Sequence, residues 1–168
     1  MLQGNTPAPG PIEERQLEVV DIREPSTEPG ACVVYLDLLP DRNDGAYSDL
    51  LASLEPAVYV LHVRPTSDRL LDASAAAAIT GEAAHLIRER VGRSAATEVH
   101  LLLRCPWGVA LLLGRALNTV RARVYEWEDG PDDAGDTVAA RYLPSLLVRS
   151  GAGGSSIETV LLPTRVTP

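Results

Sequence analysis

Short apolar runs rich in Val, Ile and Leu recur along the chain and predict a series of β-strands. Segments rich in Gly, Pro, Asp and Ser separate these runs and are typical of turns and loops. The predicted strands cover residues 17–22, 32–39, 58–63, 99–103, 120–127, 142–148 and, as a last edge strand, 157–162.

Helical spacing of apolar residues appears between these strands. Residues 46–54 fit a short helix, and 68–91 fit a long one whose Ile79, Ala83 and Ile87 share one face. A third helix, 107–117, is apolar nearly all round, so we expect it to be covered by the sheet and by something else. The order ββαβαβαβββ predicts an α/β fold: a Rossmann-like three-layer domain with a mostly parallel central sheet.

The length of 168 residues corresponds to one domain, which we assign to residues 17–163. Residues 1–16 contain Pro and Gly but no basic start and no apolar core, and they predict a disordered lead-in rather than a signal peptide. The apolar runs are too short to span a membrane. Two cysteines are too few for a disulfide framework, so we expect a cytoplasmic protein.

The charged residues of the sequence exclude some classes of function. The sequence has no Lys, which excludes a Walker-type phosphate loop and Schiff-base chemistry. The net charge of −8 argues against a long nucleic acid as partner. Residues 56–125 nevertheless hold nine Arg against five acidic residues. This basic middle segment indicates either an anion site or Arg side chains solvated on helix faces.

The residue patterns typical of catalytic and metal-binding sites are incomplete in this sequence. Cys105 follows a buried strand and precedes a helix, but a phosphatase-type loop would need an Arg six residues later, where Leu111 stands. His62 and His100 have no further ligands at metal spacing. The Gly-rich segment 151–156 lies between strands and predicts a flexible hairpin. We therefore expect no catalytic residue, metal or cofactor, with Cys105 as a small buried filler.

Binding chemistry remains at the carboxyl ends of the predicted parallel strands, where helix N-termini offer free N–H groups to anions. Segments 39–42, 64–67 and 104–108 should meet there. Two Arg side chains could pair with phosphates, two hydroxyls could donate hydrogen bonds, and a Trp could either stack on a base or fasten its helix to the core. The candidate ligand-binding residues are Arg64, Thr66, Ser67, Arg104, Pro106, Trp107 and Gly108.

One stretch resembles a known family. After the strand 99–103 and the turn at Pro106, the helix carries Ala110-x-x-x-Gly114-x-x-x-Asn118, and the next strand ends in Tyr125-Glu126. A Tyr-Pro pair follows in displaced form as Tyr142-Leu143-Pro144. This pattern resembles the C-terminal half of the SAVED domain, "SMODS-associated and fused to various effectors", over 97–148 and, by element order, over 17–148.

The resemblance implies a CARF-like sensor of cyclic oligonucleotide second messengers in a bacterial anti-phage, CBASS-like defence system. The family domain holds two CARF-like halves, and this chain has room for one, without an attached effector. We therefore expect a non-catalytic sensor or adaptor that works with a separate effector protein or a homodimer partner.

Two alternatives stay open. One is a ring-nuclease-type phosphodiesterase that degrades cyclic oligonucleotides, and the other is a pure protein-interaction module without a ligand. If Arg64 and Arg104 bind the ligand, replacing both with Ala should abolish binding without unfolding the domain.

Overall fold

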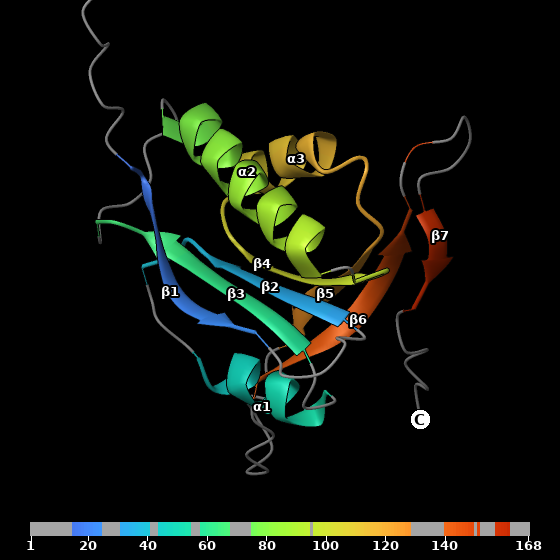
Figure 1. The fold of residues 1–168 in the computed structure, drawn as a ribbon. Coiled ribbons are helices and arrows are strands. Elements are labelled where there is room, and N and C mark those ends of the chain that lie inside the picture. The colour runs from blue at the N-terminus through green and yellow to red at the C-terminus, as the bar shows by residue number, and fades with distance from the viewer. Residues whose placement is uncertain are drawn as a thin grey trace, which may run out of the picture.

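Strands and helices follow one another in the predicted order (Figure 1). The computed structural model describes residues 15–24, 31–40, 44–54, 58–67, 75–94, 96–128, 140–149, 151 and 157–161. The strands are β1 Leu17–Arg23, β2 Ala31–Asp37, β3 Val58–Pro65, β4 Val99–Arg104, β5 Ala122–Glu128, β6 Arg141–Val148 and β7 Ile157–Val160, and the helices are α1 Gly45–Ser53, α2 Ala76–Ser94 and α3 Trp107–Ala116.

Three predicted segments fall largely or wholly outside the described residues. They are the lead-in 1–16 apart from its last two residues, the start of the long predicted helix at 68–74, and the Gly-rich segment 151–156 apart from Gly151. Within the described part of the chain, no helix is long and apolar enough to cross a membrane.

The seven strands form one sheet in the order β1-β3-β2-β4-β5-β6-β7. The four central strands, β3, β2, β4 and β5, run parallel, while β1, β6 and β7 are added antiparallel at the two edges. The α/β class is confirmed, and the parallel arrangement applies to the central strands. Parallel neighbours need crossover connections, and α1, α2 and α3 lie in those connections.

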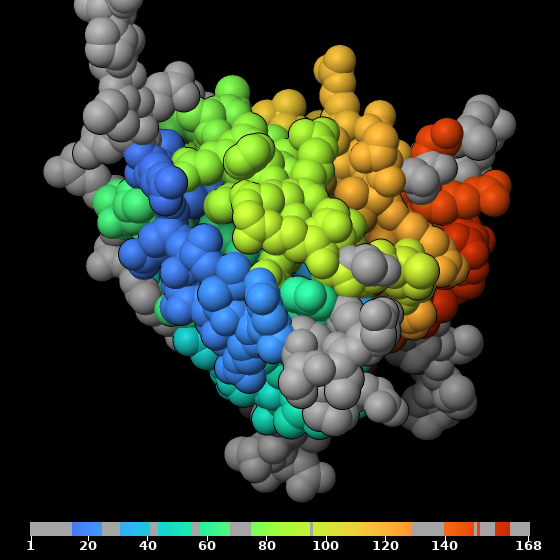
Figure 2. Space-filling view, viewed as in Figure 1, coloured from blue at the N-terminus to red at the C-terminus, as the bar shows by residue number. Residues whose placement is uncertain are grey.

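One face of the sheet is covered by α2 and α3, which lie side by side in Figure 2. The side chains between these helices and the sheet are almost all aliphatic, for example Val34, Leu61, Ile87 and Leu113. Such a contact gains stability mainly from apolar area removed from water. We call this side the aliphatic face.

Among the described elements, α1 covers the other face, below the sheet in Figure 1. Its core is smaller and aromatic, with Tyr35, Tyr47, Tyr125 and Tyr142 among its buried side chains. Helix α1 lies against β6 and places Tyr47 in a stack on Tyr35 of β2, with ring centroids 4.5 Å apart. We call this side the aromatic face.

Helix α3 departs from expectation. It was expected to be covered on both sides, but only one side packs, through Val109 and Leu113. Trp107 and Leu111 project to the surface with exposed fractions of 88% and 72%. The outer side of α3 is therefore apolar but is not packed against another element in the described part of this chain.

Candidate functional site

The register of the parallel strands places three charged residues side by side. Asp37 ends β2 and is paired in register with Arg104, the last residue of β4. On the other side of β2, Leu36 pairs with Val63, so Arg64 of β3 lies beside Asp37. Because side chains alternate between the faces of a sheet, all three follow the buried Tyr35, His62 and Leu102 of the aromatic face. An acid therefore lies between two cations.

The three side chains form a connected ion-pair network. The Nε of Arg64 donates to one carboxylate oxygen of Asp37 at 3.0 Å, and Nη1 of Arg104 donates to the other at 2.8 Å. The Asp37 side chain is 1% exposed. Removing a carboxylate from water is costly, and two guanidinium partners offset that cost.

Asp44 joins this network from outside the sheet. It directly precedes α1, and its carboxylate accepts a hydrogen bond from Nη2 of Arg64 at 2.5 Å. Burial by itself lowers the pKa of Arg64, but the hydrogen bonds and charges of Asp44 and Asp37 outweigh it and raise that pKa. Two cations and two carboxylates make the four-residue network neutral in total. We call Arg64, Arg104, Asp37 and Asp44 the charged row.

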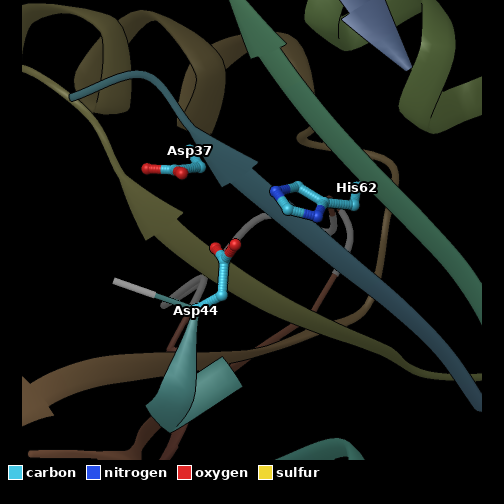
Figure 3. A group of neighbouring side chains, drawn as sticks. All are labelled: Asp37, Asp44 and His62. Atoms are coloured by element: carbon cyan, nitrogen blue, oxygen red, sulfur yellow. The ribbon is translucent and has the colours of Figure 1, made fainter. Parts of the chain in front are cut away.

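Asp37, Asp44 and His62 also place one potential metal-ligand atom each within 4.8 Å of one another (Figure 3). This group could not be recognised from the sequence, because the three residues do not stand at a metal-ligand spacing along the chain. Both carboxylates are already bonded to the guanidinium of Arg64. A positively charged group therefore holds the position that a metal ion would need, and the arrangement favours an ion-pair network over a metal site.

Below the charged row lies a cluster of aromatic side chains. His62 of β3 contacts Tyr35 and Tyr47, with ring centroids 4.7 and 5.1 Å apart, and Tyr142 of β6 meets Tyr35 edge-on. Burial and then the charge of Arg64 lower the pKa of His62, so its ring is neutral. The Nε2 atom of His62 and the hydroxyl of Tyr47 are buried without a hydrogen-bond partner in the described structure. Such groups cost about 1–3 kcal/mol each.

Thr66 and Ser67, both candidate residues, lie just past the end of β3. The hydroxyl of Thr66 donates toward the carbonyl oxygens of Arg15 and Gln16, at 3.2 and 3.4 Å, and its N–H donates to Gln16. Thr66 therefore connects β3 to the segment that leads into β1. Ser67 is exposed. The structure brings neither hydroxyl into the charged row.

The remaining candidates lie where β4 turns into α3. Pro106 precedes the helix, and its carbonyl accepts the N–H groups of Val109 and Ala110. Gly108 has nothing within 4 Å of the position that a Cβ would take. Trp107 is 88% exposed, so the interpretation that it fastens α3 to the core is wrong. An exposed indole three residues after Arg104 is placed to contact a ligand or a partner.

Cys105 lies between Arg104 and Pro106 and is half-buried. Burial raises the pKa of its thiol to about 11. The thiolate, which is the nucleophilic form, is therefore scarce at neutral pH. This agrees with the expectation of a packing residue rather than a nucleophile.

The sequence predicted both Arg residues of the charged row and missed both Asp residues. Asp37 left a signal, because it is the only charged residue in the apolar run 31–39 and ends its strand as Arg104 ends the neighbouring one. Asp44 left none, because an acid in the polar segment 41–45, which also contains Asp41, looks like any loop residue. The segment 39–42, expected at this edge, is described only as far as Pro40.

The fold and the charged row define an α/β domain of Rossmann-like type with charged groups at the carboxyl ends of its parallel strands. The sequence model of the SAVED family, described as the "SMODS-associated and fused to various effectors sensor domain", matches residues 9–142. The chain belongs to the SAVED family. The expected resemblance is confirmed and extends well before residue 97.

Solved structures give the same fold. The chain is similar to the Acinetobacter baumannii Cap4 SAVED/CARF-domain containing receptor with the cyclic trinucleotide 2'3'3'-cAAA, at a TM-score of 0.64 and 16% identity over 80% of this chain and 28% of that one. The same receptor with 3'3'3'-cAAA gives a TM-score of 0.62 at 16% identity, over 79% of this chain and 27% of that one. This chain thus spans about a quarter of those receptors' length. No match was found among curated proteins.

Proposed function

We propose that this chain is a non-catalytic sensor or adaptor that binds a cyclic oligonucleotide at the charged row and acts through a separate effector protein in a CBASS-like anti-phage system. The observation that carries the proposal is the register that places Arg64 and Arg104 together at the carboxyl ends of β3 and β4. Ligands of parallel α/β sheets bind at this edge. Membership of a sensor family and the similarity to receptors solved with cyclic trinucleotides support the same ligand class.

Each part of the site has a role in this proposal. Guanidinium groups make charge-assisted hydrogen bonds to phosphates, and Arg104 makes one such bond, to Asp37, within the described structure. In this proposal, the remaining N–H groups of Arg104, whose side chain is 15% exposed, bind a phosphodiester. Trp107 offers an exposed ring on which a base stacks, a contact worth about 1–3 kcal/mol.

A partner protein is the second half of the proposal. Leu111 lies one helical turn after Trp107 and is also exposed, so the outer side of α3 is apolar at the surface. Contiguous exposed apolar patches mark interaction surfaces, and Trp107, Leu111 and Leu112 are exposed apolar neighbours on this helix. This surface is also the observation that favours the alternative, a pure interaction module without a ligand.

The test begins with the melting temperature of the wild-type chain against cyclic di-, tri- and tetranucleotides, including both forms of cAAA. A ligand at 100 times its dissociation constant stabilises the fold by about 2.7 kcal/mol, which raises the melting temperature of a domain of this size by about 5–11 °C. A shift with one member supports the sensor. No shift with any member, in a folded protein that co-purifies with a partner, contradicts it and favours the interaction module.

The variant that tests the site is Arg104→Gln rather than the Arg64→Ala, Arg104→Ala pair. Removing both guanidiniums would leave the carboxylate of Asp37 buried without a cation, so the double variant would unfold. Arg104→Gln leaves Asp37 bonded to Arg64. We expect it to fold and to lose the ligand-induced shift, whereas Arg115→Gln, on the last turn of α3, keeps it.

A further inference from the structure

The geometry points to Asp44 as a built-in competitor of the ligand: its carboxylate holds the anion position on Arg64, and a phosphate of the ligand displaces it and releases the start of α1. This inference rests on the proposed function, because it describes how the charged row exchanges one anion for another. It concerns a residue outside the sheet.

The two carboxylates that bind Arg64, those of Asp37 and Asp44, differ in burial and in the guanidinium nitrogen that they contact. Asp37 is 1% exposed and bonds to Nε, whereas Asp44 is 48% exposed and bonds to Nη2. The inner carboxylate is therefore fixed by burial and by a second cation, Arg104. The outer carboxylate lies at the solvent side of the guanidinium, where a dissolved anion meets it first. The Arg64 side chain is 8% exposed, so the carboxylate of Asp44 is the member of this ion pair that solvent reaches and that an anion can replace.

Charge balance supports the exchange. The charged row is neutral while Asp44 is in place, so an anion that adds to it would leave an excess negative charge beside a buried carboxylate. If Asp44 leaves, one phosphodiester carries the same single negative charge and restores neutrality. His62 adds no charge to this balance, because burial and Arg64 lower its pKa.

Asp44 is also tied to α1. Its carbonyl accepts the N–H of Ser48, which makes Asp44 the residue that starts the helix. Figure 3 shows its carboxylate reaching from the helix start toward the strand that carries Asp37. Tyr47, in the first turn of α1, packs on Tyr35 and His62. Displacing the carboxylate therefore removes a tether between α1 and the sheet, and α1 becomes the element that reports a bound ligand.

The test compares Asp44→Asn with Asp49→Asn in the full chain. Both variants remove one acid from the α1 region, but Asp49 is an exposed residue within the helix that has no ion pair in the described structure. Inorganic phosphate is titrated into each protein while the Nε–Hε signal of Arg64 is followed by NMR. We expect Asp44→Asn to bind phosphate about fivefold more tightly than the wild type, with Asp49→Asn equal to the wild type.

Hydrogen exchange of residues 45–53 gives the second readout. We expect exchange in α1 to rise in Asp44→Asn without phosphate, and in the wild type only when phosphate is added. Equal or weaker phosphate affinity in Asp44→Asn, or no response of Arg64 in any of the three proteins, overturns the inference.

A parallel titration with 3'3'3'-cAAA and 2'3'3'-cAAA separates the two claims. If phosphate behaves as expected and no cyclic oligonucleotide binds any of the proteins, the proposed function fails and the competition by Asp44 stands. If a cyclic trinucleotide binds wild type and Asp44→Asn equally well and phosphate shows no difference, the proposed function stands and the inference falls.

Discussion

The two faces of the sheet are built from the same strands and differ in chemistry. Toward α2 and α3, the strands present Val34, Leu36, Leu61 and Val63, which pack in an aliphatic core. Toward α1, the alternate residues of the same strands include Val33, Val60 and Leu102 but also aromatic side chains, and they end in the charged row. The aliphatic face gains its stability mainly from apolar burial, although Arg90 of α2 has a buried Nε without a partner in the described structure. The other buried unpaired atoms found there, on Tyr35, Tyr47, His62 and Tyr142, belong to the aromatic face and lower stability.

That difference separates folding from function within one sheet. A buried histidine, an unpaired tyrosine hydroxyl and a buried carboxylate add little to stability, because apolar side chains of similar size often fill such positions at lower cost. They gather at the edge of the sheet where parallel strands end. Under the proposed function, the aliphatic face stabilises the fold and the aromatic face binds the ligand, and four changes test this division.

The largest loss of stability is expected from Leu113→Ala on α3. Leu113 is fully buried against the sheet, and removing its side chain leaves a cavity that costs about 3–4 kcal/mol of unfolding free energy. Leu111→Ala is the matched control on the same helix and should change stability by less than about 0.5 kcal/mol. Denaturant unfolding measures both, and equal effects would show that α3 does not pack as described.

A smaller loss is expected from Asp37→Ala. It removes the shared partner of Arg64 and Arg104, but Asp44 still pairs with Arg64 and solvent still reaches part of Arg104. The cost should therefore be about 2–3 kcal/mol, below the range for a fully buried pair. Asp49→Ala controls for loss of an acid. A change under about 0.5 kcal/mol in Asp37→Ala would mean that the charged row is not formed in solution.

Acid should weaken the fold through His62. Burial, assisted by Arg64, lowers its folded pKa below the unfolded value near 6.5, so the unfolded chain binds the proton first. Protonation of His62 does not affect stability above about pH 7. As the pH drops below about 6.5, the free energy of unfolding falls by up to about 1.4 kcal/mol per pH unit. His100 shifts in the same direction through its own burial. Unfolding between pH 7.5 and 5.5 should show a shallower slope in His62→Gln.

His85→Gln on the exposed side of α2 serves as the control for that slope and should leave it unchanged. A slope that stays the same in His62→Gln would show that the ring is solvated rather than held among Tyr35 and Tyr47.

The smallest effect on stability is expected from Trp107→Ala. The side chain is almost fully exposed, so its removal should change the free energy of unfolding by less than about 0.5 kcal/mol. A Trp that packed in the core would cost about 3–5 kcal/mol instead. Thermal or denaturant unfolding distinguishes an exposed Trp107 from one packed in the core. A loss of about 3–5 kcal/mol would show that Trp107 stabilises the fold.

The sequence predicted the order and type of elements because periodicity and turn residues are local signals. Each predicted strand and helix has a counterpart among the described residues, with ends that differ by a few residues, as for the strand predicted at 120–127 and found at Ala122–Glu128. The start of the long helix stays a prediction, because residues 68–74 lie outside the described part of the chain. It also predicted that Arg64 and Arg104 end strands that meet at one edge. The expectation for the two Arg residues needs only the rule that the carboxyl ends of parallel strands lie at the same edge of a sheet.

The charged row itself could not be predicted, because it depends on which strand lies between which. Asp37 lies between the two Arg residues only because β2 is inserted between β3 and β4, against the order of the chain. Asp44 and Tyr142 reach the site from a loop and from an antiparallel strand far along the sequence. The exposure of Trp107 was equally hidden, because an all-apolar helix gives no periodicity to show which side is buried.

Hydrogen exchange with and without a cyclic oligonucleotide tests the division between the two faces most directly. Each member of the panel, beginning with 3'3'3'-cAAA, is added to the wild-type chain, and exchange is mapped along the sequence. We predict protection around Asp37, Arg64 and the segment 104–108, with α2 unchanged. Protection on α2, or no change with any member of the panel, would contradict the assignment of the aromatic face as the ligand site.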